Sequence, residues 1–215
     1  MNSQKKDGVE DGPWTEWHEN GQKKTIVHFK DGLPNGLCTE WHENGQKADE
    51  GNFKDGKEEG FWISWYENGQ KEGEGHYRGG KEEGLITKWH ENGQKKSEEH
   101  YKNGKEEGLM IGWYENGQKE FEGHFIDGKK SGFWTVWYDN GQKESEGHYK
   151  DGIGDGLVIR WHENGQKERE IHYEDGKENG SWTYWYDNGQ KKSEGYGKDN
   201  KAEGLRTDFY ENVNK

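Results

Sequence analysis

Aromatic and polar positions alternate along this chain in a pattern that repeats every 24 residues. The stretch from Gly60 to Gly84 shows it in full, as two short runs with aromatic residues at alternate positions. Asn-Gly separates these runs, and a turn rich in glycine and lysine follows them. Alternation with a period of two is typical of half-buried strands, and Asn-Gly between two such runs is typical of a β-hairpin. Each repeat is therefore expected to form one hairpin.

A tryptophan just before each Asn-Gly marks the phase of the repeat. It occurs at Trp17, Trp41, Trp65, Trp89, Trp113, Trp137, Trp161 and Trp185, and Phe209 follows in phase. No residue is inserted or deleted between these positions, so every repeat is predicted to be the same supersecondary unit. Two strands for each of eight units plus a terminal half unit predict 17 strands.

We predict an all-β repeat protein of tandem antiparallel β-hairpins with a 24-residue period. The hairpins are expected to form one elongated, twisted, curved single-layer sheet, because long open sheets twist. Residues 1–12 are expected to be a frayed N-terminal half repeat. Residues 13–215 are expected to be a single repeat domain of eight full units plus a terminal half unit. The first strand is expected to begin at Pro13.

The length of the loop around Asn-Gly decides which side chains share a face of the sheet. A two-residue loop would place the Trp65 side opposite glutamates and a histidine. A three-residue loop, Glu67-Asn68-Gly69 with its glycine left-handed, would place Trp65 opposite Lys71 and put Gly73 and Gly75 on the Trp65 side. Glycine opposite a large ring leaves room for it. We therefore predict the three-residue loop and one recurrent apolar face that carries Trp65.

Composition alone would point to a disordered chain. Charged residues make up 35% of it and the mean hydropathy is −1.58, values typical of segments that cannot bury enough apolar surface to fold. The 12 tryptophans and 11 tyrosines argue against disorder, because they keep strict register and large rings bury much apolar area. We therefore expect a folded chain.

The net charge and the cysteine content indicate which kinds of partner and which compartment to expect for this chain. The net charge of −13 repels nucleic acid and anionic lipid surfaces and favours a basic partner. One cysteine, Cys38, permits no intramolecular disulfide and fits a reducing compartment. The first residues lack the apolar run of a signal peptide, and no stretch is long and apolar enough to span a membrane. A cytoplasmic protein is expected.

Ten histidines raise the alternative of a metal site. They fall in two columns, His18, His42, His90 and His162 after tryptophan, and His28, His76, His100, His124, His148 and His172 before an aromatic residue. Neighbours in a column are one repeat apart, roughly 10 Å by strand spacing. The nitrogens that share one zinc ion must lie within ~4 Å of each other. No metal site is therefore expected.

Catalytic chemistry is not indicated by any motif. Cys38 occupies a strand position that holds Trp62 or Ile86 in other repeats, so a small apolar role is expected for it. No nucleophile-elbow or phosphate-binding string is present, and the glycines recur in phase as turn glycines. The chain is predicted not to be an enzyme, with no catalytic residues and no cofactor. The lysines after each Asn-Gly-Gln are expected to form a solubilising edge, with contact to lipid phosphates as the less favoured alternative.

The face opposite the predicted Trp65 side varies from repeat to repeat, which suits recognition. Its candidate partner-binding residues are Met110, Tyr114, Trp134, Tyr138, Trp182, Tyr184 and Tyr186. Aromatic clusters on an extended surface are typical of interface anchors. The alternative is that these rings cover the second side of the sheet or contact another copy of the chain.

Two elements of the repeat resemble a known family. Gly75-His76-Tyr77-Arg78-Gly79-Gly80 and Gly147-His148-Tyr149-Lys150-Asp151-Gly152 resemble the MORN (membrane occupation and recognition nexus) repeat, with glycine, an aromatic residue and two spaced glycines. The additional WYENGQK element is similar to the variant in bacterial YwqK-type proteins, which are regarded as antitoxins of toxin–antitoxin modules. The resemblance covers about residues 13–210.

The resemblance implies hairpin repeats in an extended sheet and carries over no catalytic residues. It implies a non-catalytic protein-binding module, and the antitoxin hypothesis suits an acidic inhibitor of a basic toxin. The alternative is a structural or membrane-peripheral scaffold. The expected partner is another protein, with no nucleic acid and with membrane lipid less favoured. The sequence leaves the oligomeric state open.

Overall fold

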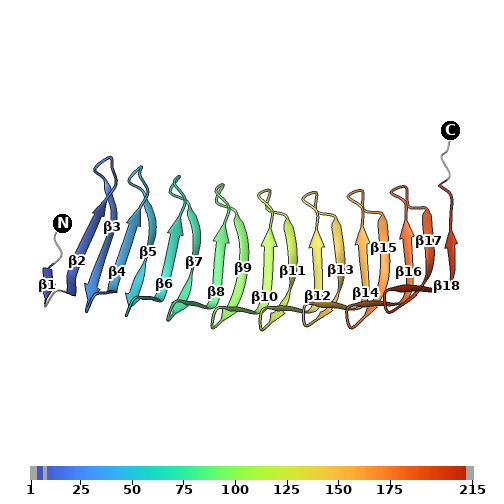
Figure 1. Cartoon of the computed structure of the whole chain (residues 1–215). Helices are drawn as coiled ribbons and strands as arrows, with labels where there is room; N and C mark the ends of the chain where they lie inside the picture. Colours follow the sequence, from blue (N-terminus) through green and yellow to red (C-terminus); the bar gives the residue numbers. More distant parts are fainter. Residues whose placement is uncertain (1–3, 7–8, 212–215) are drawn as a thin grey trace. The chain divides into compact units, whose positions relative to one another are not determined.

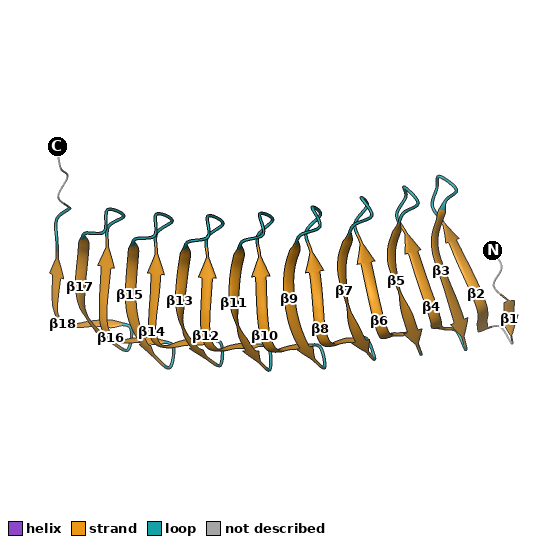
Figure 2. Ribbon diagram, turned by 180° about the vertical axis from the view of Figure 1, so that it is seen from behind, coloured by secondary structure: helices purple, strands orange, loops and turns teal. Residues whose placement is uncertain are grey.

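The structure, a computed structural model, describes residues 4–6 and 9–211 of the chain. Its contacts divide the chain into two units, residues 1–105 and 106–215, and each is described by itself. The described residues form strands and loops without a helix (Figure 2). They accordingly offer no helix of the length and apolar character needed to cross a membrane.

Successive strands pair antiparallel within each unit, as Figure 1 shows. The first unit contains β1 (Gln4–Lys6), β2 (Val9–Trp17), β3 (Lys23–Lys30), β4 (Leu33–Trp41), β5 (Lys47–Lys54), β6 (Lys57–Trp65), β7 (Lys71–Arg78), β8 (Lys81–Trp89) and β9 (Lys95–Lys102). The second contains β10 (Lys105–Trp113), β11 (Lys119–Ile126), β12 (Lys129–Trp137), β13 (Lys143–Lys150), β14 (Ile153–Trp161), β15 (Lys167–Glu174), β16 (Lys177–Trp185), β17 (Lys191–Lys198) and β18 (Lys201–Asp208). The predicted all-β hairpin-repeat class is confirmed.

The N-terminal end differs from the prediction. Strands β2 to β18 are the 17 that were expected, and β1 is an additional short strand, with Lys6 paired to Val9. Strand β2 begins at Val9 and not at Pro13, because its first residues pair with β1. The expected fraying of residues 1–12 falls partly on 1–3 and 7–8, outside the described residues, and the single domain over 13–215 stays a prediction.

The loop after each even-numbered strand from β2 to β16 has the predicted length. Between β6 and β7, Gly69 N–H donates to the Tyr66 carbonyl and Tyr66 N–H donates to the Gln70 carbonyl, both at 2.9 Å. Gly69 has a φ of 81°, which only glycine adopts without strain. Trp65 lies opposite Lys71. The three-residue loop Glu67-Asn68-Gly69 is therefore confirmed.

The predicted apolar face is wrong, because an extra residue follows the loop. Trp65 pairs with Lys71 but Ser64 pairs with Gly73, so Glu72 has no partner across the ladder and forms a β-bulge. A bulge of one residue exchanges the two faces beyond it. Further along the pair Trp62 lies opposite Gly75, and Phe61 lies opposite His76. The glycines thus face Trp62 and not the Trp65 side.

The second connection is a two-residue turn followed by another irregularity. Asp55 and Gly56 have φ values of 50° and 77°, as a type I′ hairpin turn requires. Beyond it, Asn52 pairs with Glu59 but Glu50 pairs with Ile63. The pairing of β6 with β5 is interrupted beside Gly60, whose φ is 87°. Figure 2 shows the ribbon bending at this end of the hairpin. Asp55, Gly56 and Gly60 therefore all have positive φ in this connection.

Most buried apolar side chains lie on the face that carries Trp62, which we call the core face. Its central column is Trp14, Cys38, Trp62 and Ile86 in the first unit and Met110, Trp134, Val158 and Trp182 in the second. Trp134 is 3% exposed, and a Cβ at Gly123 would lie only 2.2 Å from its indole. Glycine therefore lets the ring lie directly on the neighbouring strand.

The opposite surface, the outer face, is exposed. Phe61 is 44% exposed and Phe133 is 48% exposed, and their rings lie 5.1 Å from the rings of His76 and His148. Within each unit the strands form one layer, so neither face is covered by a second sheet or by a helix of the described residues. Both faces are thus accessible to a partner.

Candidate functional site

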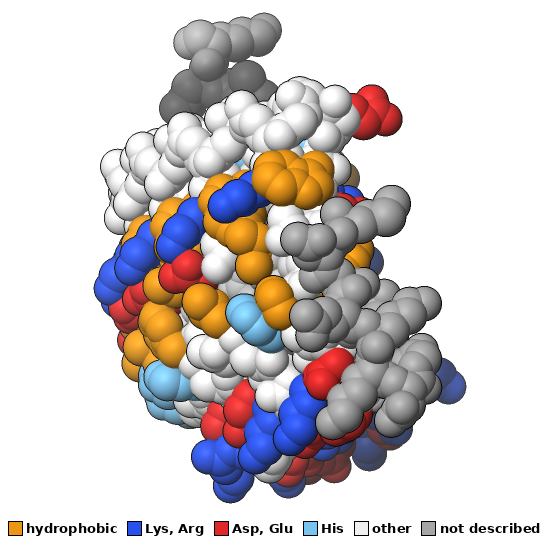
Figure 3. Space-filling view, turned by 90° about the vertical axis from the view of Figure 1, so that its left-hand side faces the viewer, with side chains coloured by type: hydrophobic (Ala, Val, Ile, Leu, Met, Phe, Trp, Pro, Cys, Tyr) orange, Lys and Arg blue, Asp and Glu red, His pale blue; other side chains and the backbone are white. Residues whose placement is uncertain are grey.

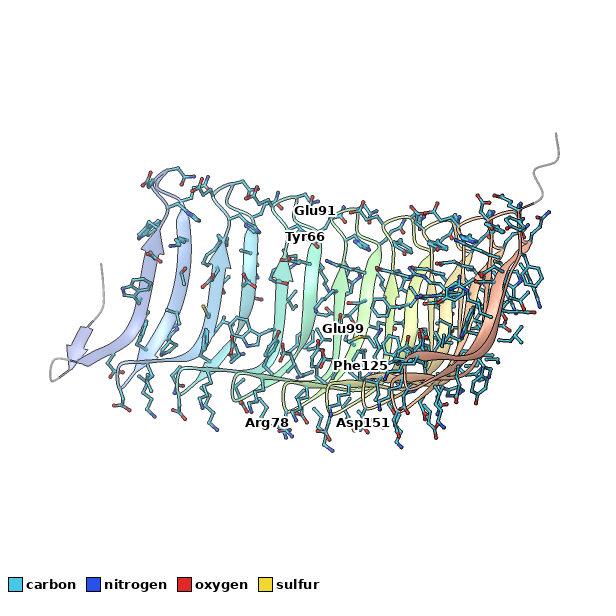
Figure 4. The ribbon with its side chains drawn as sticks, turned by 45° about the vertical axis from the view of Figure 1, so that its right-hand side comes forward. Tyr66, Arg78, Glu91, Glu99, Phe125 and Asp151 are labelled. Carbon is cyan, nitrogen blue, oxygen red and sulfur yellow. The ribbon has the colours of Figure 1, made fainter. Side chains whose placement is uncertain are left out.

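Within each unit, hydrogen bonds between corresponding residues tie one repeat to the next at the Asn-Gly loop edge. Tyr66 Oη donates to the Trp89 carbonyl at 2.7 Å, and His42 Nε2 bonds the Trp65 carbonyl at 2.7 Å. Asn68 Nδ2 donates to the carbonyl of Glu91 at 2.9 Å. Figure 4 shows Tyr66 and Glu91 near this edge. The side chains after each tryptophan therefore have a structural role, which histidine and tyrosine fill alike.

The other histidine column is exposed on the outer face. It holds His28, His76, His100, His124, His148 and His172. In the part of the chain that the structure describes, no three His, Cys, Asp or Glu residues form a group able to hold a metal ion. All six imidazoles of this column are exposed to solvent.

The lysines after Asn-Gly-Gln pack on the next tryptophan. Lys71 Nζ lies 5.5 Å from the centre of the Trp89 ring and 2.6 Å from Glu74 Oε2. The same arrangement recurs for Lys167, with Trp185 and Glu170. Figure 3 shows lysine and acidic side chains side by side in rows near the first strands. These ammonium groups are already paired with a ring and a carboxylate.

Three of the predicted partner-binding residues form part of the core-face floor in the second unit. Met110 and Trp182 are each 9% exposed and Trp134 is almost fully buried. Trp182 contacts a fourth, Tyr184, with the ring centres 5.6 Å apart. Met110, Trp134 and Trp182 are therefore packing residues of the core face. The prediction that they bind a partner stays a prediction.

The other three predicted residues lie at the loop edge. Tyr114 Oη and Tyr138 Oη each donate a 2.7 Å hydrogen bond, to the carbonyls of Trp137 and Trp161. Tyr186 Oη donates to the Phe209 carbonyl at 3.1 Å. Their hydroxyl groups therefore join successive repeats. Only the faces of their rings are left to contact a partner.

A hollow on the core face of the second unit includes Trp182 and Tyr184. It has a volume of about 370 Å³, and Lys192 and Arg206 also line it. The Arg206 guanidinium lies 5.9 Å from the Trp182 ring centre. This is where the structure brings two of the predicted residues together in a concave surface.

A larger cavity, of about 540 Å³, lies on the core face of the first unit. Sequence reasoning missed it. Its floor includes Trp62 and Tyr77, and carboxylates line it from Glu40, Asp49, Glu58 and Glu72. Cavities with an aromatic floor and a few charged groups are typical binding sites.

Burial and nearby carboxylates raise the pKa values of several groups in this cavity. Burial raises the pKa of the Asp49 carboxyl, and the Glu72 charge raises it further against the lowering effect of His42. Burial and the Asp49 charge likewise raise the pKa of Glu40, although Lys24 opposes this. Burial, followed by the charges of Glu82, Glu58 and Asp49, raises the pKa of the Tyr77 hydroxyl. The site therefore favours positive charge.

The sequence held a weak signal for this cavity. Asp49 stands where the neighbouring repeats have Thr25 and Gly73, so it places a carboxylate where the adjacent repeats have a small residue. The bulge at Glu72 places that carboxylate on the same side, and nothing in the sequence marks the bulge. Without the bulge, these acids cannot be assigned to one face.

Comparison with protein families matches the chain to the MORN repeat variant, eight times in succession. The matched residues are 10–31, 34–55, 58–78, 82–103, 106–127, 132–151, 154–175 and 178–199. Each match covers most of one 24-residue repeat. A search of curated proteins finds no match to the chain. Repeats of this kind are commonly protein- or membrane-binding modules. On the evidence of its eight matched repeats, the chain belongs to the MORN repeat variant family.

Proposed function

We propose that the chain is a non-catalytic protein-binding module and acts as an antitoxin that neutralises a toxin by direct contact. The observation that carries the proposal is the uncovered core face, where large rings border hollows of about 540 and 370 Å³, one in each unit. Trp and Tyr at the centre of such surfaces are the residues that dominate binding energy in protein interfaces.

The sign of the charge supports a basic partner. The chain carries a net charge of −13, and many of its lysines are held against tryptophan rings and carboxylates. Opposite charge steers association and disfavours wrong partners. A toxin that acts on nucleic acid carries a basic surface, which an acidic binding face would cover. The likeness of the WYENGQK element to YwqK-type proteins points the same way.

Co-expression with the toxic product of a neighbouring gene tests the proposal. We expect rescue of growth and co-purification of the two proteins. Tyr184→Ala removes a half-buried ring from the core-face hollow of the second unit, and we expect affinity to fall about tenfold. Leu157→Ser is the matched control, because Leu157 is exposed on the outer face of the same unit. Absence of both rescue and co-purification contradicts the antitoxin proposal.

A structural or membrane-peripheral scaffold is the second candidate, and the outer face favours it. Large apolar side chains recur there once per repeat, at Leu37, Phe61, Leu85, Phe133 and Leu157, all exposed. Contiguous exposed apolar residues are typical of association surfaces. Flotation with anionic vesicles and light scattering separate the candidates. The scaffold predicts vesicle binding or large assemblies that Phe61→Ser and Leu85→Ser reduce, whereas the antitoxin predicts neither.

A further inference from the structure

We propose that the cavity around Trp62 in the first unit binds a basic side chain, arginine or lysine, of the partner polypeptide. This inference rests on the proposed function as a protein-binding module and names the chemistry that one part of the face recognises. Four observations carry it. The cavity has an aromatic floor, it has an excess of carboxylates, and most of these carboxylates have no internal partner. In another repeat, a lysine occupies the equivalent place.

The floor of the cavity is aromatic. Trp62 is half-buried, and Phe53 meets its ring edge-on with the ring centres 5.0 Å apart. Tyr77 lines the same cavity. Gly51 lies beneath the indole, which fixes its plane, because a Cβ there would be 2.1 Å from the ring. A rigid indole face attracts a cation brought over it.

The walls of the cavity are acidic. Five carboxylates line it, from Glu40, Asp49, Glu58, Glu72 and Glu74, against two ammonium groups, from Lys88 and Lys96. Lys88 is already paired with Glu99 at 3.0 Å, and Glu74 is paired with Lys71. The remaining groups leave a clear excess of negative charge around the Trp62 ring.

Four of these five carboxylates, all but Glu74, form no side-chain hydrogen bond or ion pair within the described residues. Neither Asp49 nor Glu72 forms a hydrogen bond or an ion pair there. Burial raises the pKa of the Asp49 carboxyl, and the charge of Glu72 raises it further. An incoming cation would relieve both effects, because opposite charge favours the ionised form of a carboxyl group. A guanidinium group can accept two carboxylates at once.

The second unit shows a cation in the corresponding place. Lys130 Nζ lies 4.3 Å from the centre of the Trp134 ring and 5.6 Å from that of Tyr149. Three repeats earlier, the same positions hold Glu58, Trp62 and Tyr77. The ring pair is therefore kept while the lysine is replaced by a carboxylate. The surface that takes an internal cation in one unit is lined with acid in the other.

A peptide titration tests the inference. The probe is a short capped glycine–serine peptide with a pair of arginines, and its reference is the same peptide with glutamines. Titration calorimetry with the full chain should show binding of the arginine peptide only. The test variant is Asp49→Asn with Glu72→Gln, and circular dichroism checks its fold. We expect its affinity for the arginine peptide to fall about tenfold.

The control variant is Glu120→Gln with Asp175→Asn, which removes two charges from equivalent or exposed positions of the second unit. Glu120 holds the same repeat position as Glu72, and Asn103 already occupies the position of Asp175 in another repeat. The control should bind the arginine peptide within about twofold of the wild type, since distant charges are screened. An equal loss in both variants would show that only net charge matters and would overturn the inference.

Three further outcomes also overturn it: no binding of the arginine peptide, equal binding of the glutamine peptide, or tighter binding of free spermidine, which would indicate a site for small amines. Co-purification of the toxin with the wild type and with the test variant distinguishes a failure of this inference from a failure of the proposed function. If the test variant holds that toxin undiminished, the inference fails and the proposed function stands. If no toxin co-purifies, the proposed function fails and the peptide titration still decides the inference.

Discussion

The hydroxyl group of Tyr138 donates a 2.7 Å hydrogen bond to the backbone carbonyl of Trp161, 23 residues further along the chain. Histidine forms the corresponding bond in other repeats, as His42 does with the Trp65 carbonyl. A side chain at the loop edge thus supplies a donor for a carbonyl of the next repeat. This contact links two repeats and does not belong to the strand ladder.

Tyr138→Phe should therefore destabilise the protein although the ring remains. The Trp161 carbonyl would lose its side-chain donor, at a cost of about 1 kcal/mol in the free energy of unfolding. Tyr138→His should recover most of this loss, because histidine fills the equivalent position in four other repeats. Urea denaturation followed by tryptophan fluorescence measures both. Equal stability of the phenylalanine and histidine variants would contradict the role of the bond.

Gly123→Ala should destabilise the second unit, because the new methyl group would lie 2.2 Å from the Trp134 ring. Overpacking of this kind costs about 1 to 3 kcal/mol. In the first unit, Val27 and Cys38 form the corresponding pair. Adding Trp134→Cys to Gly123→Val should therefore cost less than the two single changes summed. A double-mutant cycle measures this coupling, and simple additivity would refute the packing argument.

Stability should fall in acid through Glu99, a carboxyl group midway along β9 that is 8% exposed (Figure 4). Burial raises its pKa, but hydrogen bonds from Ser97, Tyr101 and Lys88, with the Lys88 charge, outweigh burial and bring the pKa below its ordinary value of 4.5. A lowered folded pKa contributes stability that is present above the unfolded value. That contribution is lost as pH falls through the folded value.

Glu99→Gln should accordingly be less stable than the wild type near neutral pH, by about 1 to 3 kcal/mol, and the difference should shrink in acid. Urea midpoints measured from about pH 7 down to about pH 3 give the comparison. Glu67→Gln, in an exposed loop, is the control and should track the wild type. A constant gap between Glu99→Gln and the wild type would count against the ion pair.

The Cys38 thiol should be unreactive in the folded protein. It is 3% exposed, and burial, with the charges of Glu40 and Asp49, raises its pKa to about 11. The thiolate is the nucleophile, so iodoacetamide at about pH 8 should label Cys38 only as fast as the chain unfolds. Mass spectrometry with and without urea measures the rate. Rapid labelling without urea would contradict the burial of this residue.

The repeat length, the hairpins and the three-residue loop follow from the sequence because each has a local signal. Asn68-Gly69 fixes a loop with one left-handed residue, and the unbroken phase of Trp65 fixes the length of each unit. The bulge at Glu72 has no such signal, since its residue type varies between repeats. Missing it exchanged the two faces of the strand that follows the loop, and so put Gly73 and Gly75 on the Trp65 side and not opposite Ser64 and Trp62.

The assignment of the candidate site residues to a face was affected in the same way. Met110, Trp134 and Trp182 belong to one column, as predicted, but the column is the floor of the core face. The cavity around Asp49 and Glu72 depends on which strand residues lie opposite each other, and therefore on the bulge. In the sequence Asp49 differs from Thr25 and Gly73 of the adjacent repeats, whereas glutamate at the position of Glu72 recurs in other repeats and gives no signal. Single-residue register is a long-range property that composition does not reveal.

The bonds that link equivalent residues of successive repeats have an architectural consequence. Asn44 reaches the carbonyl of Glu67, and Asn140 reaches that of Glu163, through the same atoms. Each hairpin thus presents to its successor the same contacts that it receives from its predecessor. Copying or deleting a whole 24-residue block would leave every remaining junction intact, whereas inserting a single residue would break one. The number of repeats can therefore change in evolution without any change to the contacts between repeats.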